Sequence, residues 1–283
     1  MEFQNIAVIG AGTMGSDVAF HIASIGQSVL LKDISEAALT DARGRIERSY
    51  KPYRMLNGDL TASMDEVLAK IQFTIDIERL KNVDFVIENI PENLNQKRKL
   101  YEELREVCSI TTVFGVNTSC IPIAEIASSL PNPENVIGIH FMNPVPLMPL
   151  VELIPALRTS EATIARVKDF LKTIRKMAVS VVDSPGFVAN RLSHLLMNEA
   201  AILVQEKLAT AEQIDIIFKK GYGHKLGPLE TADLIGLDTV VNSLDVLHAH
   251  LKNPKFACCR LLRDMVAAGV LGRKSGRGFY IYA

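Results

Sequence analysis

The sequence predicts an α/β protein in which a doubly wound parallel sheet is followed by a smaller all-α domain. Three observations support this fold class. A glycine-rich segment follows the first short apolar run, and β-type runs then alternate with helical patterns through the first two-thirds of the chain. Beyond the segment DSPG at residues 183–186 the pattern is helical only. Because such alternation is typical of a parallel sheet with crossover helices, we expect one domain over residues 1–184 and a helical domain over residues 185–283.

The strands of the first domain are predicted from short apolar runs bounded by turn residues. These runs cover residues 6–9, 28–32, 71–74, 85–88, 113–116, 136–140, 150–154 and 178–182. Ser35 can cap a helix that continues to about Tyr50. Ser63 and Glu66 have the spacing of a capping box and predict a short helix. Pro122 fits the first turn of another helix.

The second domain is predicted to be helical throughout. Its first helix has apolar residues at the spacing of one amphipathic face, which Glu199 interrupts. The apolar residues of this face are Val188, Leu192, Leu195, Leu196 and Leu203. Further helices are expected at residues 210–219, 229–250 and 259–268. This domain is small and rich in aliphatic residues, so we expect part of its surface to meet a second subunit and form a homodimer.

The composition is that of a protein with a substantial core and no membrane span. The chain has 283 residues, of which 48% are apolar, and its net charge is −1. No run approaches the ~18 uncharged apolar residues of a spanning helix. The near-neutral charge argues against a nucleic-acid-binding surface. We expect a cytoplasmic location, since the chain enters a strand soon after Met1 and leaves no room for a signal peptide.

The cysteines agree with a reducing compartment. None of Cys108, Cys120, Cys258 and Cys259 forms a C-x-x-C pair. We therefore expect neither disulfides nor a metal site. Cys120 alone lies near the site predicted below, and we interpret it as a small packing residue.

The segment NIAVIGAGTMG at residues 5–15 predicts a dinucleotide-binding turn of the Rossmann type. Its glycines fit G-x-G-x-x-G between a strand and a helix. Gly10 allows the tight turn, Gly12 lets backbone approach a pyrophosphate, and Gly15 lets the helix pack closely on the strand. The N-terminus of that helix presents N–H groups and a positive dipole to the phosphates. Asp33, which follows the next apolar run, can accept hydrogen bonds from ribose hydroxyls and repel a 2′-phosphate, so the pattern favours NAD over NADP.

A second group of polar residues follows later strands. His140 ends one apolar run, and residues 117–119 follow another. The carboxyl ends of strands in a doubly wound sheet face the ligand crevice, so we expect both to open onto it. Imidazole suits proton transfer near neutral pH, and a carboxylate such as Glu152 can fix its tautomer. A histidine at a strand end is more often structural, so these residues alone leave both roles open.

The chain resembles the 3-hydroxyacyl-CoA dehydrogenase family, including the short 3-hydroxybutyryl-CoA dehydrogenases, over nearly its whole length. The segments that carry the resemblance are GAGTMG (10–15), LLKD (30–33), IENIPENL (87–94), NTS (117–119), HFMNPVP (140–146), LVE (150–152), DSPGFVANR (183–191), GPLETADLIGLD (227–238) and GRKSGRGFY (272–280). The resemblance implies a Rossmann-type NAD domain, a helical domain that dimerises, and a part in fatty acid metabolism.

The resemblance also implies catalytic and substrate-binding roles. His140 would be the general base toward the 3-hydroxyl group in oxidation and the acid in reduction, with Glu152 as its orienting carboxylate. Ser119 and Asn190 would hydrogen-bond the reacting oxygen or the thioester side of the substrate. Ser49 matches a position that contacts the coenzyme A part.

Further residues match family positions that contact NAD. Asn143 would help to set the nicotinamide, and Glu92, Lys97 and Lys274 match other such positions. Taken without the resemblance, Lys97 would be one charge in the exposed run at residues 96–99. The full set of expected cofactor-binding residues is Gly10, Gly12, Thr13, Met14, Gly15, Asp33, Glu92, Lys97, Asn117, Ser119, Asn143 and Lys274.

Three departures from the family pattern concern the substrate and the cofactor. Asp17 stands where glycine is common, and its charge could weaken pyrophosphate binding if it points inward. Pro149 stands where lysine is usual. Leu56 falls about where a lysine that contacts coenzyme A is expected, after a stretch that carries the helix breaker Pro52. A lost phosphate-binding cation matters more for free coenzyme A than for an arm delivered by an acyl carrier protein, and nearby lysine or arginine could replace it.

The sequence thus predicts an NAD-dependent dehydrogenase of a short 3-hydroxyacyl thioester, bound to coenzyme A or to a carrier protein. A second reading keeps the fold and changes the substrate to a free hydroxy acid or sugar acid. A third is a redox-silent NAD-binding structural protein, which the retained His140 and Glu152 disfavour. The chain length of the acyl group, its carrier and the physiological direction stay open.

Overall fold

The computed structural model describes residues 3–56, 61–119 and 121–282. The chain divides into two compact units, of which the first ends at Asp183 and the second begins at Ser184. Cys120 lies outside the described residues, so its predicted packing role has no structural counterpart here.

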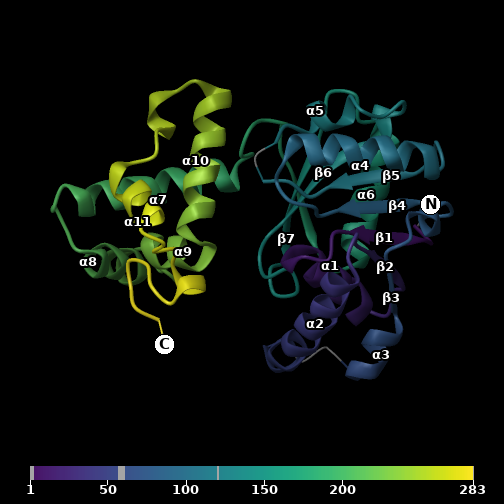
Figure 1. The fold of residues 1–283 in the computed structure, drawn as a ribbon, viewed down its shortest axis with the longest axis horizontal. Helices are drawn as coiled ribbons and strands as arrows, with labels where there is room; N and C mark the ends of the chain where they lie inside the picture. The colour runs from purple at the N-terminus through teal and green to yellow at the C-terminus, as the bar shows by residue number, and fades with distance from the viewer. Residues whose placement is uncertain (1–2, 57–60, 120, 283) are drawn as a thin grey trace. The chain divides into compact units, whose positions relative to one another are not determined.

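The first unit is built on an eight-stranded sheet in the order β3-β2-β1-β4-β5-β6-β7-β8 (Figure 1). The strands are β1 (Ile6–Ile9), β2 (Val29–Lys32), β3 (Ile71–Thr74), β4 (Phe85–Glu88), β5 (Val113–Val116), β6 (Val136–Phe141), β7 (Leu150–Pro155) and β8 (Met177–Ser180). The six strands β1 to β6 are mutually parallel, as the alternating pattern predicted. The predicted Rossmann-type fold class, with a helical region after the sheet, is confirmed.

The sheet is not parallel throughout. Strands β6 and β7 pair antiparallel, and β8 then pairs parallel with β7. The connection between β6 and β7, residues 142–149, is too short for the crossover helix that a parallel pair requires. The expectation of a parallel sheet holds for β1 to β6 and is wrong for the pair β6–β7.

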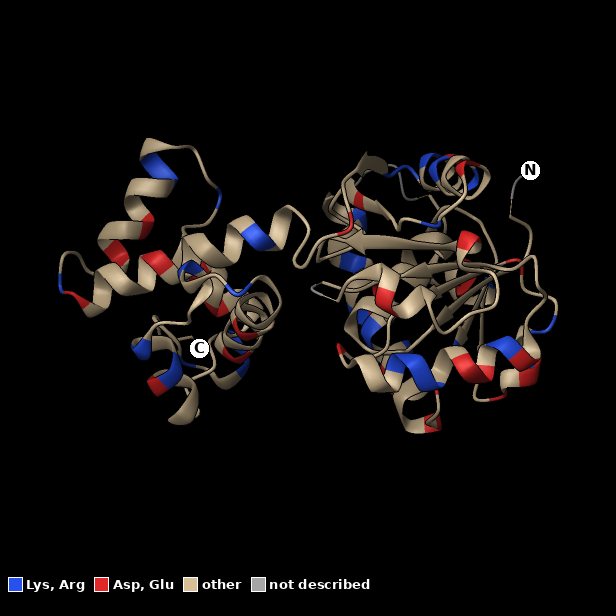
Figure 2. Ribbon diagram, turned by 90° about the horizontal axis from the view of Figure 1, so that it is seen from above, with Lys and Arg blue, Asp and Glu red and all other residues tan. Residues whose placement is uncertain are grey.

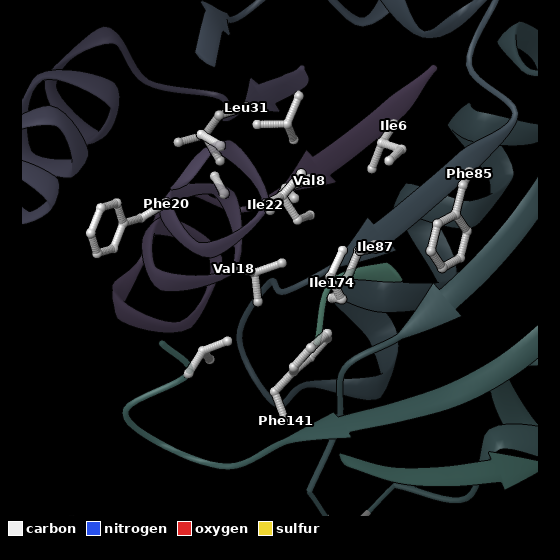
Figure 3. Close-up of a cluster of buried hydrophobic side chains, with 14 of the residues drawn as sticks. Ile6, Val8, Val18, Phe20, Ile22, Leu31, Phe85, Ile87, Phe141 and Ile174 are labelled. Atoms are coloured by element: carbon white, nitrogen blue, oxygen red, sulfur yellow. The ribbon is translucent and has the colours of Figure 1, made fainter. Parts of the chain in front are cut away.

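Helices cover both faces of the sheet. The first face is covered by α1 (Thr13–Ser24), α2 (Glu36–Leu56) and α6 (Glu161–Thr173), whose apolar side chains share one cluster with the strands. Figure 3 shows part of this cluster, with Val18 and Ile22 of α1 near Val8 and Ile87 of the sheet. The other face is covered by α4 (Leu94–Val107) and α5 (Ile123–Ala127). Because both faces are buried, the central strands read as continuous apolar runs.

The second helix is longer than predicted. Helix α2 continues through Pro52 to Leu56 instead of ending near Tyr50. A proline removes one backbone donor and normally destabilises a helix interior. Tertiary contacts support this last stretch: the Tyr50 hydroxyl donates to the Ala62 carbonyl at 2.8 Å, and the Tyr53 ring meets the Phe20 ring edge-on. The short helix α3 (Met64–Ala69) has the predicted capping box at Ser63.

The second unit is helical, as expected. Its α-helices are α7 (Ala189–Gln205), α8 (Ala211–Ile216), α9 (Pro228–Ile235), α10 (Leu237–Leu251) and α11 (Arg260–Ala267). The single helix predicted over residues 229–250 is wrong, because the chain breaks between α9 and α10 at Gly236. That residue has φ 103°, a conformation that glycine adopts without strain.

Helix α7 buries the predicted apolar face only in part. Val188 and Leu192 remain 48% and 63% exposed, while His194, Met197 and Ala201 are buried. Leu195, Leu196 and Leu203 of the predicted face are half-buried, and Leu203 packs against the apolar cluster of this unit. Aliphatic side chains thus stay exposed at the start of α7.

Two fully buried carboxylates organise the second unit. Asp215 accepts hydrogen bonds from the backbone N–H groups of Leu229 and Glu230 at 2.9 and 2.8 Å, and so caps the start of α9. Asp233 accepts from the N–H groups of Phe279 and Tyr280, each at 3.0 Å. The tail lies so close to Asp233 that a Cβ atom at Gly278 would come within 1.9 Å of its Oδ1 atom. The segments GPLETAD and GRGFY therefore have a structural role in this unit, since their backbone N–H groups bind these two carboxylates.

Asp233→Ala is expected to lower the free energy of unfolding by about 1–3 kcal/mol, because it leaves the half-buried N–H groups of Phe279 and Tyr280 without their acceptor. The Tyr282 hydroxyl, which donates to Asp233 at 2.9 Å, loses its partner as well. Urea unfolding followed by circular dichroism measures the loss, and limited proteolysis should cut the tail first. Asp264→Ala removes an exposed carboxylate and serves as the control, with a change below about 0.5 kcal/mol. Equal stability of the two variants would contradict the role of Asp233.

Among the described residues, no helix is long and apolar enough to cross a membrane. Basic and acidic residues are intermixed along the helices in Figure 2. The described cysteines are Cys108, Cys258 and Cys259, and each is a free thiol.

Candidate active site

The glycine-rich turn has the geometry that its sequence predicts. Gly10 has φ 93°, and a Cβ atom there would lie 2.7 Å from the Asn89 carbonyl oxygen. A Cβ atom at Gly15 would lie 1.7 Å from the Gly10 carbonyl oxygen, whereas one at Gly12 would meet nothing within 4 Å. Glycine is therefore required at 10 and 15 by close backbone contacts. The open space at Gly12 and the first N–H groups of α1, at Thr13, fit a bound pyrophosphate.

Asp33 and Arg45 hold this turn from two sides. The Asp33 carboxylate accepts from the N–H groups of Ala11 and Ile34 at 2.6 and 2.7 Å. The Arg45 guanidinium, from α2, donates to the Ala11 carbonyl oxygen. Asp33 therefore lies beside the glycine-rich turn at the end of β2, where an acid that selects the ribose would have to lie.

Asparagine side chains connect the carboxyl ends of the central strands. The Asn117 Nδ2 atom, after β5, donates to the Asn89 Oδ1 atom, after β4, at 2.6 Å. The Phe141 N–H group at the end of β6 donates to the Asn117 Oδ1 atom at 3.3 Å. Three strand ends are thus held together at the edge where ligands bind in doubly wound sheets.

Glu92 fixes the turn that carries Ser119. Its Oε1 atom accepts from the Thr118 hydroxyl at 2.7 Å and from the N–H groups of Ser119 and Ile121 at 3.0 and 3.3 Å. At the far end of the same segment, the Asp183 carboxylate accepts from the N–H groups that begin α5. Carboxylates therefore anchor this turn at both ends.

His140 lies between Glu152 and Ser119. His140 and Glu152 face each other across the antiparallel pair β6–β7, and the Nδ1 atom of the imidazole lies 2.8 Å from the Glu152 Oε2 atom. The Ser119 Oγ atom lies 3.3 Å from the Nε2 atom. Both titratable side chains are buried, with 6% and 3% exposure. A carboxylate at Nδ1 favours the tautomer with a proton there, which leaves Nε2 able to accept one.

Lys97 is not in an exposed run. It is fully buried, and its Nζ atom lies 2.7 and 2.9 Å from the two carboxylate oxygens of Glu88, also fully buried. Nζ also donates to the Ile90 carbonyl oxygen at 3.3 Å. The reading of Lys97 as a solvated charge is wrong, and its contact with NAD stays a prediction.

The remaining predicted site residues lie elsewhere. Asn143 is exposed in the connection between β6 and β7, and Ser49 is half-buried on α2. Asn190, in the first turn of α7, and Lys274, which pairs with Asp238, belong to the second unit. The structure thus brings Ser119, His140 and Glu152 together within the first unit.

The family departures also have definite positions. The Asp17 carboxylate accepts a hydrogen bond from the Val145 N–H group at 3.3 Å. Leu56 is 68% exposed at the end of α2, and Pro149 is exposed before β7. Arg45, Lys176 and Asn89 contribute to this region and were not predicted. Asn89 could have been found, because it directly follows a predicted strand; the two cations had no such signal.

Within the described part of the chain, no three histidine, cysteine, aspartate or glutamate side chains gather as a metal site would require.

Comparisons with known proteins identify the family. Residues 5–184 match the profile of the 3-hydroxyacyl-CoA dehydrogenase NAD binding domain, and residues 186–282 match that of the C-terminal domain. A probable 3-hydroxybutyryl-CoA dehydrogenase of Bacillus subtilis is 41% identical over 282 residues, which cover 100% of this chain and 98% of that protein. The crystal structure of M. tuberculosis FadB2 is 38% identical with a TM-score of 0.96, and that of the (S)-3-hydroxybutyryl-CoA dehydrogenase PaaH1 from Ralstonia eutropha is 38% identical with a TM-score of 0.92; each alignment covers 100% of both chains. The chain is an oxidoreductase that carries an NAD-binding domain and belongs to the 3-hydroxyacyl-CoA dehydrogenase family.

Proposed function

We propose that this protein interconverts a short-chain 3-hydroxyacyl thioester and its 3-oxoacyl form, with His140 as general base and acid. The observation that carries the proposal is the row Ser119–His140–Glu152, with 3.3 Å and 2.8 Å between the partners, beside the strand ends of an NAD-binding domain. A buried carboxylate at one imidazole nitrogen leaves the other for proton transfer. Similar proteins are named 3-hydroxybutyryl-CoA dehydrogenases, which supports a thioester as the substrate.

In oxidation, the His140 Nε2 atom accepts the proton of the 3-hydroxyl group. Glu152 keeps the imidazole oriented and stabilises the imidazolium that forms. Bound NAD supplies the acceptor for the hydride that leaves C3 of the substrate. In reduction, the imidazolium returns its proton to the developing alkoxide at C3.

Other residues bind and orient in this proposal. Ser119 and Asn190 hydrogen-bond the reacting oxygen or the thioester group, and Ser49 contacts the carrier of the acyl chain. Asn143 helps to set the nicotinamide. The proposed contacts to NAD are made by Gly10, Gly12, Thr13, Met14, Gly15, Asp33, Glu92, Lys97, Asn117, Ser119, Asn143 and Lys274.

We propose coenzyme A as the carrier of the acyl group, and an acyl carrier protein as the alternative. Leu56 offers no charge at the end of α2, but Lys51 and Arg54 are exposed in the same last turns. A phosphate could bind there through either cation.

Rates with 3-hydroxybutyryl-CoA, its carrier-bound equivalent and a free 3-hydroxy acid, each with NAD and with NADP, test this proposal. We expect the highest kcat/KM with the coenzyme A thioester and NAD. A higher value for the carrier-bound substrate would move the proposal to a carrier protein. A higher value for the free acid would replace the thioester by a hydroxy or sugar acid, and NAD binding without turnover on any substrate would revive the redox-silent alternative.

We further propose that the protein is a homodimer and that the second unit forms the contact. Exposed apolar side chains on its helices support this, among them Leu192 on α7 and Leu234 on α9, 63% and 50% exposed. Sedimentation equilibrium, which gives the mass of the particle in solution, tests it.

A further inference from the structure

Opposite charges hold the two backbone polar groups of a single residue, Val145, in the connection between β6 and β7. The Val145 N–H group donates to the Asp17 Oδ2 atom at 3.3 Å. The Val145 carbonyl oxygen accepts from the Lys176 Nζ atom at 2.5 Å, and the same ammonium group donates to the Met148 carbonyl oxygen at 2.8 Å. Asp17 lies in α1, and Lys176 directly precedes β8. Three separate parts of the chain therefore meet at residues 142–149.

This connection lies between the residues of the proposed site. His140 precedes it on β6, and Glu152 follows it on β7. Asn143 lies within it, two residues before Val145. Helix α1, which carries Asp17, is the helix whose N-terminus follows the glycine-rich turn. The contact between Asp17 and Val145 thus connects the helix that binds the pyrophosphate with the segment that carries the proposed nicotinamide contact.

Charge and burial strengthen the contact. Lys176 is 6% exposed, and burial lowers its pKa to about 8, against the opposing effect of Asp17. Burial raises the pKa of Asp17 to about 6, although its bond to Val145 and the charges of Arg45 and Lys176 act to lower it. On the same side of α1, His21 is buried near Lys176 and Arg175, and burial lowers its pKa to about 4. At neutral pH, Asp17 is therefore an anion beside cations, with a neutral histidine one turn away.

We propose that Asp17 is a positioning residue: together with Lys176 it holds the β6–β7 connection against α1 and so places Asn143 for the nicotinamide ring. This inference rests on the proposed function, because Asn143 matters only if NAD reacts at this site. The Asp17 carboxylate binds the β6–β7 connection, so its charge is not directed at the proposed pyrophosphate site. Rigid support of a binding residue affects turnover more than affinity when it acts on the reacting part of the cofactor.

Asp17→Ala, Asp17→Asn and the control Asp41→Ala test the inference in the full-length enzyme. Asp41 is an exposed carboxylate on the neighbouring helix α2, so its removal changes the net charge equally. Hydrogen exchange read by mass spectrometry reports the mobility of residues 142–149 without any need for turnover. Steady-state kinetics with 3-hydroxybutyryl-CoA then separates kcat from the KM for NAD.

For Asp17→Ala we expect faster exchange at residues 142–149 and a kcat about three- to tenfold lower, the effect of one hydrogen bond of ordinary net strength. The KM for NAD should change less than about twofold, because the adenosine half is held elsewhere. Asp17→Asn keeps an acceptor for the Val145 N–H group and should restore at least half of the lost kcat. The ratio of wild-type to Asp17→Ala kcat should also decrease from about pH 7.5 to about pH 5.5 as Asp17 takes up its proton. It should decrease only to the ratio of Asp17→Asn to Asp17→Ala, because the neutral carboxyl group keeps an acceptor oxygen. A ratio taken at each pH cancels the effects of pH that both enzymes share.

Unchanged exchange at residues 142–149 in Asp17→Ala would overturn the inference, as would an effect equal to that of Asp41→Ala. A lower KM for NAD with unchanged kcat would also overturn it, because the carboxylate would then act on the pyrophosphate. Inactivity of the wild-type enzyme on every 3-hydroxyacyl substrate would instead remove the proposed function, while the exchange measurement would still decide whether Asp17 holds the connection.

Discussion

Replacement of His140 by glutamine is expected to lower kcat for 3-hydroxyacyl thioester oxidation by at least about 10²–10⁴-fold, the usual contribution of a placed proton-transfer group. Glutamine has a similar size and can still hydrogen-bond Glu152 and Ser119, so the surrounding residues keep their partners. It cannot take up the hydroxyl proton at neutral pH. Formation of NADH in the presence of saturating substrate measures the loss.

NAD binding separates this loss from misfolding. The dissociation constant of NAD, measured by calorimetry, should stay within about threefold of wild type, since His140 is proposed to act on the substrate hydroxyl. His248→Gln, at an exposed position on α10, is the matched control and should keep full activity. If His140→Gln retained most of its turnover, another group would have to be the base.

The central part of the sheet was predictable because its physical requirements are local. A strand that is buried on both faces needs an apolar run. β1 and β5 have one over all four of their residues, and β4 has one over its first three, before the buried Glu88. The glycine-rich turn was predictable for a similar reason. A Cβ atom at Gly15 or Gly10 would lie only 1.7 or 2.7 Å from a backbone carbonyl oxygen, so no other residue fits at these positions.

Features that depend on tertiary contacts were not predictable. The direction of β7 is an exception. Its apolar run is the same in a parallel or an antiparallel pair, but the short connection before it leaves no room for a crossover helix, so the antiparallel pairing could have been predicted. Pro52 marks a helix end by propensity, but contacts of the flanking Tyr50 and Tyr53 with other segments support the helix beyond it. A glycine such as Gly236 can lie within a helix or end one, so the sequence does not predict the break between α9 and α10, where Gly236 has a positive φ.

The candidate site divides in the same way. Ser119 and His140 were placed correctly at strand ends, because the rule for doubly wound sheets needs only the strands. The distance between His140 and Glu152 depends on the register of β6 against β7, which the sequence alone leaves open. For Lys97, charge alone predicted an exposed side chain, because its buried partner Glu88 reads as an ordinary strand residue.

Lys97→Met is expected to lower the free energy of unfolding by about 3–5 kcal/mol, because it leaves the fully buried Glu88 carboxylate without its counter-ion. Methionine fills a similar volume, so the loss reports charge and hydrogen bonding and not a cavity. Burial raises the pKa of Glu88, and Lys97 opposes that rise. Without Lys97 the rise becomes larger, although the hydrogen bond from the Ile90 N–H group still opposes it. A carboxyl group with a raised pKa binds its proton more tightly in the folded state, so the variant should lose stability as the pH increases from about 5 to about 8. Urea unfolding at these pH values measures both effects.

The double variant Glu88→Gln/Lys97→Met tells charge burial from other causes. With a neutral amide in place of the carboxylate, no unpaired charge is left. The double variant should therefore be more stable than Lys97→Met at pH 8 and should lack the extra loss of stability that Lys97→Met shows as the pH increases. Arg98→Met, at the next and partly exposed position of α4, should change stability by less than about 1 kcal/mol. A Lys97→Met enzyme with wild-type stability would contradict the structural role of the buried pair. A raised KM for NAD in such a variant would leave the proposed contact with NAD as the role of Lys97.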